Sequence, residues 1–277
     1  MNGALTVAGL EVRLGFRNRW VLATTLLMAV LALSIAMLGQ SPAGNIDADP
    51  LIVAIVSLAS LTIFLIPLMA LLLSYDAIVG EVDQGTMLLL LSYPVSRTAV
   101  VLGKFFGQTT IIGLATLLGY GLAGIIVAFS QESGASAEGW IALAKLIVSA
   151  ILMGAAFVGL GLACSSFTRQ RGAAAGLAVS LWLLFVIVFD LLLLGALVSG
   201  FDSVISEGAF PMMLLANPAD VFRMLNMELV AGSGLVSGFA KVSANASIAT
   251  AGLWGALLLW SVSPLAVAVL FFKRSDI

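Results

Sequence analysis

Residues 174–198 read AAGLAVSLWLLFVIVFDLLLLGALV, an apolar run with one charged side chain, Asp190. About 20 apolar residues in a helix cross the hydrocarbon core of a bilayer, so this stretch predicts a membrane span. Hydrophobic residues make up 61% of the 277-residue chain, charged residues 9%, and the mean hydropathy is +1.17. Alternating strand patterns are absent, which argues against a membrane β-barrel. We therefore predict an all-α integral membrane protein with six transmembrane helices, near 21–39, 51–74, 106–129, 141–166, 174–198 and 247–272.

The positions of lysine and arginine predict the orientation of these helices. With six spans, nine basic residues fall on the side of the two termini and three on the opposite side. Basic residues accumulate in cytoplasmic loops, so we expect a multi-pass protein of the bacterial inner membrane with both termini in the cytoplasm. The residues after the first span make a poor signal-peptidase site, so that span is expected to remain. The nine are Arg13, Arg17, Arg19, Arg97, Lys104, Arg169, Arg171, Lys273 and Arg274, and the three are Lys145, Arg223 and Lys241.

Several classes of catalytic chemistry lack the residues they need. The chain has no histidine, and its one cysteine, Cys164, is expected to be a small buried residue. Histidine-based triads, cysteine-rich zinc sites and Cys-X-X-Cys redox motifs are therefore excluded. The only Gly-Lys pair, Gly103-Lys104, lacks the upstream glycine and the following hydroxyl residue of a phosphate-binding loop. We predict a non-catalytic membrane subunit that binds no cofactor and takes its energy from another chain or an ion gradient.

We predict a single transmembrane domain over residues 1–277, with three segments outside the spans. Residues 1–20 combine apolar positions with three arginines, which favours an interfacial helix over a frayed terminus. Residues 76–104 form the densest charged loop. Residues 199–246 form the longest non-spanning segment, on the outer side, where apolar patches alternate with Gly208, Pro211 and Pro218. Short helices packed against the outer membrane edge, or dipping into it, fit that pattern best.

Asp190 is the main candidate for a pathway residue within a span. A carboxylate near the middle of a membrane helix costs about 3 kcal/mol, so its presence calls for a reason. One interpretation is a coupling group in a gradient-driven carrier. The other is a polar residue packed against a neighbouring helix or reaching the outer interface, and we favour it because the sequence shows no obvious basic partner for Asp190.

The loop from Ser74 to Gln108 reads SYDAIVGEVDQGTMLLLLSYPVSRTAVVLGKFFGQ and carries the sharpest signal in the chain. Three acids precede a Gly-Thr turn, an apolar helical run follows, and two bases lie beyond it. Such a sequence predicts a short amphipathic element at the membrane face that can dock into a groove on a partner. An ordinary solvated loop is the alternative. The residues of this pattern are Asp76, Glu81, Asp83, Gly85, Thr86, Pro94, Arg97 and Lys104.

Four methionines lie close together in the outer segment: Met212, Met213, Met224 and Met227. Thioethers are soft ligands that suit Cu(I), so the group is a weak candidate for copper contact. No histidine exists and Cys164 lies far along the chain, so we favour the alternative that these methionines fill irregular packing.

The run E-x-x-x-G-T-x-x-x-L-L-S-x-P-V-S-R, from Glu81 to Arg97, followed by Lys104, resembles the first cytoplasmic loop of ABC-2 type transporter permeases. The six-span layout, the N-terminal interfacial helix and the long outer segment agree with that family. The resemblance implies a homodimer that works with two copies of a separate ATPase, in which ATP and Mg²⁺ bind. It also implies that residues 81–97 form the main coupling helix, that Arg169 and Arg171 make a smaller second contact, and that 199–246 holds re-entrant helices.

Within this family, the overall character and half-size form are similar to permeases of the systems that mature the copper centres of nitrous oxide reductase. That resemblance implies a cytoplasmic ATPase and a periplasmic copper-binding protein as partners. The expected function is to couple ATP hydrolysis to movement of a substrate or of the periplasmic partner. The alternative is a gradient-driven carrier, or a membrane scaffold, that uses Asp190.

Overall fold

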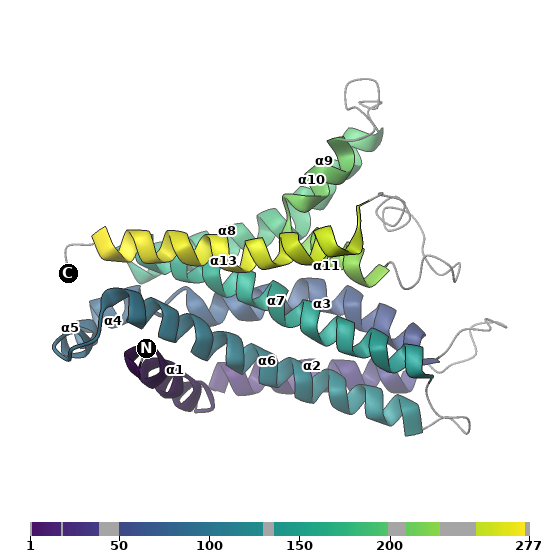
Figure 1. Ribbon diagram of the computed structural model, residues 1–277, viewed down its shortest axis with the longest axis horizontal. Helices are drawn as coiled ribbons and strands as arrows, with labels where there is room; N and C mark the ends of the chain where they lie inside the picture. Colours follow the sequence, from purple (N-terminus) through teal and green to yellow (C-terminus); the bar gives the residue numbers. More distant parts are fainter. Residues whose placement is uncertain are drawn as a thin grey trace.

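The computed structural model describes residues 2–17, 19–38, 50–129, 136–198, 209–227 and 248–274, and nearly all of these are helical (Figure 1). In lipid a helix satisfies its own backbone N–H and C=O groups, which is why so apolar a chain folds this way. The long elements are α1 (Asn2–Gly15), α2 (Arg19–Leu38), α3 (Pro50–Ser74), α6 (Arg97–Phe129), α7 (Ala137–Phe167), α8 (Arg171–Leu183) and α13 (Thr250–Arg274). The shorter ones are α4 (Val79–Asp83), α5 (Thr86–Leu91), the π-helix η1 (Leu184–Val188), α9 (Phe189–Val198), α10 (Ala209–Leu215) and α11 (Pro218–Met227).

Five of the predicted spans are helices long and apolar enough to cross a membrane: α3, α6, α7, α13 and the continuous α8–η1–α9. The predicted first span falls on α2, a 20-residue helix that packs against α6. α6 begins at Arg97, nine residues before the predicted boundary, because the charged loop ends in a helical turn rather than running up to the span. At 1.5 Å per residue α6 is about 50 Å long, so it extends beyond a hydrocarbon core of about 30 Å.

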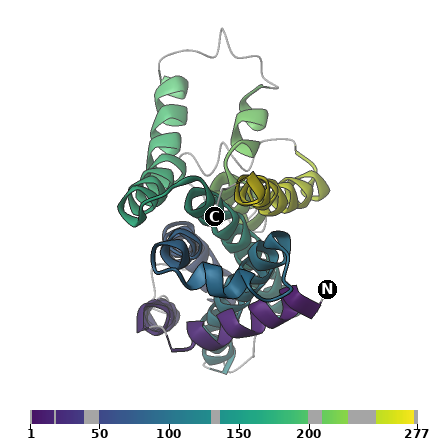
Figure 2. The same cartoon turned by 90° about the vertical axis from the view of Figure 1, so that its left-hand side faces the viewer.

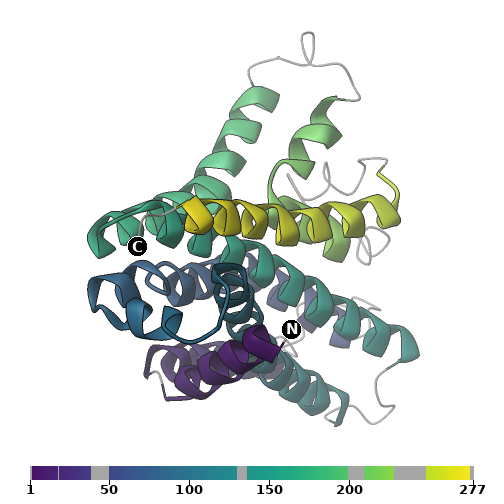
Figure 3. The same ribbon diagram turned by 60° about the vertical axis from the view of Figure 1, so that its left-hand side comes forward.

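The long helices form a bundle with two distinct ends (Figure 1). α4 and α5 lie at one end, together with α1 and the last residues of α13, and we call this the α4–α5 end. α11 lies at the opposite end, which we call the α11 end. Viewed from the α4–α5 end, α1 crosses the face of the bundle, while α9 and α10 project from the opposite side (Figures 2 and 3).

α7 is the central helix of the bundle and packs against α3, α6 and α13. In its most apolar window 67% of the residues are buried, the highest share among the five spans. Small side chains allow this packing: a Cβ atom on Gly159 would lie 3.2 Å from the backbone nitrogen of Leu265 in α13. Gly159 and Ala163, which are four residues apart, thus let two helix backbones approach closely. Between α3 and α6, the buried hydroxyls of Thr62 and Tyr120 share a 2.7 Å hydrogen bond.

α1 packs against α6 at two glycines that are also four residues apart. A Cβ atom on Gly103 would lie 2.5 Å from Val7 Cβ and 2.8 Å from the Ala4 carbonyl oxygen. A Cβ atom on Gly107 would lie 2.5 Å from Glu11 Cβ. No side chain fits at either position without moving α1, because real Cβ atoms do not approach other atoms this closely. The two glycines therefore determine how near Glu11 comes to the α6 backbone.

Gly103→Ala tests this close approach. The added methyl group has to displace α1, so we expect the variant to lose about 1–3 kcal/mol of stability. Gly121→Ala is the matched control, because it lies on the same helix with nothing within 4 Å of the new Cβ. There alanine gains helix propensity of up to about 1 kcal/mol. The measurement is the thermal unfolding midpoint of both full-length variants in one detergent, and equal shifts would contradict the packing described.

Candidate functional site

The charged loop folds into two short helices, α4 and α5 (Figure 1), which are separated by a turn at Gly85. Gly85 has φ 73°, in the left-handed region that glycine adopts at little cost, and it lets the chain reverse between the two helices. The Thr86 hydroxyl donates a 3.2 Å hydrogen bond to the Glu81 carbonyl oxygen across this turn. The amphipathic element predicted from the sequence is therefore a helix–turn–helix.

Ser165 of α7 holds the beginning of α4. Its buried hydroxyl oxygen accepts hydrogen bonds from the backbone N–H groups of Ile78 and Val79, at 2.9 and 3.0 Å. N–H groups at the start of a helix have no partner within the helix, so a side chain from another element satisfies them here. This contact fixes the position of α4 relative to the central helix.

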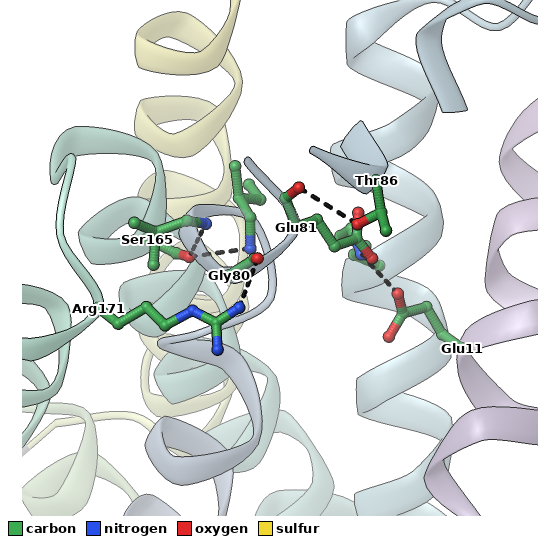
Figure 4. Close-up of polar contacts among 9 residues, drawn as sticks. Glu11, Gly80, Glu81, Thr86, Ser165 and Arg171 are labelled. Atoms are coloured by element: carbon green, nitrogen blue, oxygen red, sulfur yellow. Dashed lines mark hydrogen bonds and ion pairs between the residues drawn. The ribbon is translucent and has the colours of Figure 1, made fainter. Parts of the chain in front are cut away.

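Lys104 of α6 ties α4 to α1 through two carboxylates. Its Nζ lies 2.6 Å from Glu11 Oε1 and 2.6 Å from Glu81 Oε1, and its side chain is 2% exposed (Figure 4). An ammonium group this deeply buried requires paired charges, because desolvation costs several kcal/mol per ion. The three residues come from three different elements, so we call them the Lys104 triad. The triad makes the position of α4 depend on both α1 and α6.

Arg171 joins the second loop to the first. Its Nη2 donates a 2.6 Å hydrogen bond to the Gly80 carbonyl oxygen, and its Nε lies 3.4 Å from Asp76 Oδ1 and 3.2 Å from Asp83 Oδ2. Arg171 is the first residue of α8, so these contacts link α4 directly to the fifth predicted span. The carboxylates are 41% and 62% exposed, which makes the hydrogen bond to Gly80 the stronger part of the link.

Other residues predicted for coupling lie around this junction. Arg97 is the first residue of α6; its Nη1 donates a 3.2 Å hydrogen bond to the Phe272 carbonyl oxygen, and its guanidinium lies 5.8 Å from the centre of the Phe272 ring. It therefore contacts α13. Pro94 and Arg169 are exposed. α5 also presents two exposed apolar side chains, Leu88 and Leu89, and Tyr93 follows just after the helix; each is more than 60% exposed. Such side chains are typical of a docking surface.

A second cluster of charges lies at the α11 end. Arg223 of α11 places Nη1 3.1 Å from Asp190 Oδ1 and Nη2 2.6 Å from Asp190 Oδ2, a bidentate pair. Its Nη1 also pairs with Asp220 one turn earlier in α11. Asp190 thus has a basic partner, contrary to the expectation from the sequence, because the fold brings together residues 33 positions apart. Burial raises the pKa of the Asp220 carboxyl above its ordinary value, while the Arg223 guanidinium acts in the opposite direction.

Asn217 connects this cluster to the π-helix in the fifth predicted span. Its Oδ1 accepts from the Ala219 N–H at 3.0 Å, which caps α11 ahead of Pro218. Its Nδ2 donates to the Phe185 carbonyl oxygen at 2.7 Å and to Asp220 Oδ2 at 2.9 Å. A π-helix changes the i→i−4 hydrogen-bond pattern locally, so Asn217 bonds the backbone where η1 departs from regular α-helix.

The four candidate methionines do not share one environment. Met212 and Met213 of α10 are 69% and 42% exposed, whereas Met224 of α11 is buried in the core and 4% exposed. Met227 is partly buried at the last residue of α11. No group of three or more His, Cys, Asp or Glu side chains in the described residues has an arrangement that would hold a metal ion. Cys164 is buried, as predicted.

Five residues of these clusters were not predicted as site residues from the sequence: Glu11, Ser165, Asn217, Asp220 and Arg223. The sequence did contain a signal for Glu11. Gly103 and Gly107 lie on either side of Lys104 and four residues apart, a spacing that predicts another helix packed close to that lysine. The run Asn217-Pro218-Ala219-Asp220 carries the N-cap, first-turn proline and first-turn acid of a helix start, so it could have located α11 and hence Arg223. Nothing in the sequence around Ser165 distinguishes it from other serines.

Comparison of the sequence with known proteins identifies the family. The family model for ABC-2 family transporter protein matches residues 5–277, so the chain belongs to the ABC-2 family of transporter permeases. It is similar to a protein of Stutzerimonas stutzeri described as probable ABC transporter permease protein NosY, with 41% identity over 279 residues and 99% of both chains covered. A protein of Pseudomonas aeruginosa with the same description is 40% identical over 275 residues, with 98% of both chains covered. The resemblance of the chain to this family is thereby confirmed.

Lys104→Met tests the energetic weight of the Lys104 triad. The variant leaves two carboxylates facing each other without the base between them, so we expect a loss of about 3 kcal/mol or more. Lys273→Met, at an exposed position, should have little effect. Adding Glu11→Gln and Glu81→Gln to Lys104→Met removes the unpaired charges and should recover most of the stability. The readout is the thermal unfolding midpoint; a triple variant no better than Lys104→Met would count against an ionic role.

Proposed function

We propose that this permease converts ATP hydrolysis by a separate ATPase into movement of its own helices. The ATPase docks on α5 and its neighbouring residues, and α4 transmits the displacement. The observation that carries the proposal is the connection of α4 to four other elements: to α1 and α6 through the Lys104 triad, to α7 through Ser165, and to α8 through Arg171. A short element held in this way cannot shift without moving the spans.

In this proposal the α4–α5 end faces the cytoplasm and the α11 end faces the periplasm of a bacterial inner membrane. The orientation follows from the predicted excess of basic residues on the side of the termini. It is supported by the placement of α4, α5, the start of α1 and the end of α13 at one end of the bundle (Figure 1). An ATPase, which works in the cytoplasm, would then meet the exposed side chains of α5.

We propose a homodimer with two ATPase subunits, in which ATP and Mg²⁺ bind. One bundle of this size forms half of a transport pathway, so a second copy is needed. The α8–η1–α9 helix has a surface suited to contact with that copy. Only 17% of its most apolar window is buried within one chain. Gly172 and Gly176 of α8 have nothing within 4 Å of an added Cβ and are exposed. Small residues four apart on a free helix face favour close helix–helix contact in a membrane.

The likeness to two permeases described as NosY supports a place for this chain in copper-site assembly of nitrous oxide reductase. The partners proposed on that basis are a NosF-like cytoplasmic ATPase and a NosD-like periplasmic copper-binding protein. The methionines of α10 and α11 range from exposed to buried, so copper handling is assigned to the periplasmic partner rather than to this chain.

Co-expression with the candidate ATPase tests the docking surface. Leu89→Glu places a charge on the exposed face of α5 and should abolish co-purification. Glu81→Gln leaves that face intact but weakens the link from α4 to α6, so the ATPase should still co-purify while permease-dependent ATP hydrolysis falls. Met212→Glu, at an exposed position on the α11 end, is the control and should change neither property. If the ATPase binds Leu89→Glu as well as wild type, α5 is not the docking element.

Asp190→Asn separates the permease from a gradient-driven carrier. Arg223 keeps Asp220 as a partner in this variant, so an ABC permease should retain its ATPase-dependent activity with only a modest drop in thermal stability. A carrier that moves protons through Asp190 would lose all activity, and its wild type would also stop in the presence of a protonophore. ATP hydrolysis and transport-linked activity, measured with and without protonophore, distinguish the two outcomes.

A further inference from the structure

A cavity of about 530 Å³ lies at the α4–α5 end, between α1, the end of α3, α4 and the first turns of α6. This volume is in the usual range of small-molecule binding sites. One part of its wall is polar and contains Glu11, Asp76, Glu81, Lys104 and Gln108. The other part is apolar and contains Leu14, Met69, Leu72, Leu73 and Ile111. The cavity therefore suits a ligand with a polar head and an apolar body.

The polar wall carries an excess of negative charge. Glu11, Asp76 and Glu81 line the cavity with one base, Lys104, whose ammonium is engaged by one oxygen of each glutamate. Arg171 lies near Asp76 but is shared with Asp83 outside the cavity. Carboxylates in the wall attract a positively charged ligand head and repel a negatively charged one, so a cationic head is favoured.

Gln108 supplies an independent sign of a missing partner. The residue is 2% exposed and lines the cavity, yet its Oε1 accepts no hydrogen bond. A buried carbonyl oxygen without a donor is destabilising by about 1–3 kcal/mol, so proteins rarely retain one without a reason. A ligand bearing N–H donors would satisfy it. Glu11 and Glu81 line the same cavity, and each has a second carboxylate oxygen besides the one that pairs with Lys104.

The cavity adjoins the surface expected to contact lipid. Leu14 of α1 and Leu72 of α3 belong to its wall and are 50% and 42% exposed. α1 also exposes Leu5 and Leu10, and Phe16 just after its end is exposed, while Val7 packs against α6. Exposed leucines on a helix with arginines near its end are typical of helices that lie at a membrane interface. A lipid headgroup can therefore enter from the side without passing through the bundle.

We propose that this cavity binds a primary ammonium group on an apolar body, namely the headgroup of an aminophospholipid such as phosphatidylethanolamine. The ammonium donates hydrogen bonds to Gln108 Oε1 and to the free carboxylate oxygens of Glu11 and Glu81, and the glycerol and first acyl carbons lie along Leu14 and Leu72. A choline head lacks N–H donors and a glycerol head lacks the positive charge. The site therefore distinguishes phosphatidylethanolamine from phosphatidylcholine and phosphatidylglycerol. The inference requires a membrane location but no ATPase partner.

The test measures lipid retained by the full-length chain. The chain is reconstituted in nanodiscs with equal parts of phosphatidylethanolamine, phosphatidylcholine and phosphatidylglycerol, then released, and the bound lipids are counted by native mass spectrometry. Wild type should retain phosphatidylethanolamine preferentially. Gln108→Leu should reduce that preference by about tenfold, the usual weight of one hydrogen bond to a charged group. Gln170→Leu makes the same change at an exposed position and should keep it.

Thermal unfolding in detergent excludes a folding defect as the cause. Gln108→Leu removes an unpartnered buried oxygen, so without lipid it should unfold at the same temperature as wild type or higher. Added phosphatidylethanolamine should then stabilise wild type more than the variant. Unfolding in the presence of hexylammonium tests whether a soluble amine supplies the ammonium ligand, and hexanol is the neutral control. If hexylammonium stabilises the chain but no lipid is retained, the cavity binds an ammonium group and the lipid is rejected as its source. No headgroup preference and no effect of hexylammonium overturn the proposal.

Discussion

The ammonium group of Lys104 sets the arrangement at the α4–α5 end. A lysine on α6 whose side chain is 2% exposed is stable only while carboxylates surround its charge, and the two that do so come from α1 and α4. Glu11 comes this close only because Gly103 and Gly107 leave α6 without side chains where α1 crosses. One buried charge and two missing Cβ atoms therefore hold three elements together. Displacement of α4 has to move α1 and α6 or separate charges in a poorly solvated place.

The same pattern, one base between two acids, occurs three times in the described part of the chain. Lys104 pairs with Glu11 and Glu81, Arg171 with Asp76 and Asp83, and Arg223 with Asp190 and Asp220. Each base connects separate segments, and each cluster keeps an excess of negative charge. At the α4–α5 end this excess lies beside an apolar wall and an unpartnered amide oxygen, which is the basis for inferring an ammonium ligand there.

The fifth predicted span links the two ends of the molecule. Its first residue, Arg171, contacts α4, and its other half carries Asp190, which pairs with α11. Between these points the helix is weakly packed, its Trp182 Nε1 donates to the Phe64 carbonyl oxygen, and η1 interrupts the regular hydrogen-bond pattern. A helix attached at both ends and weakly packed between them suits the proposed transmission, because movement at one end changes contacts at the other with little repacking of a core. π-helical turns are frequent at functional positions.

Composition and hydropathy alone determined that this chain is a helical membrane protein, because lipid leaves a polypeptide few ways to satisfy its backbone. They also located the described spans to within nine residues and singled out the charged loop, since charges are costly everywhere except between spans. The pairing of those charges was decided only by the tertiary structure. Lys104 was expected at the edge of a loop and lies buried in a helix; Asp190 showed no partner and meets Arg223 from 33 residues away. The amino-acid sequence shows where a charge is costly, whereas its oppositely charged partner depends on which helices lie side by side.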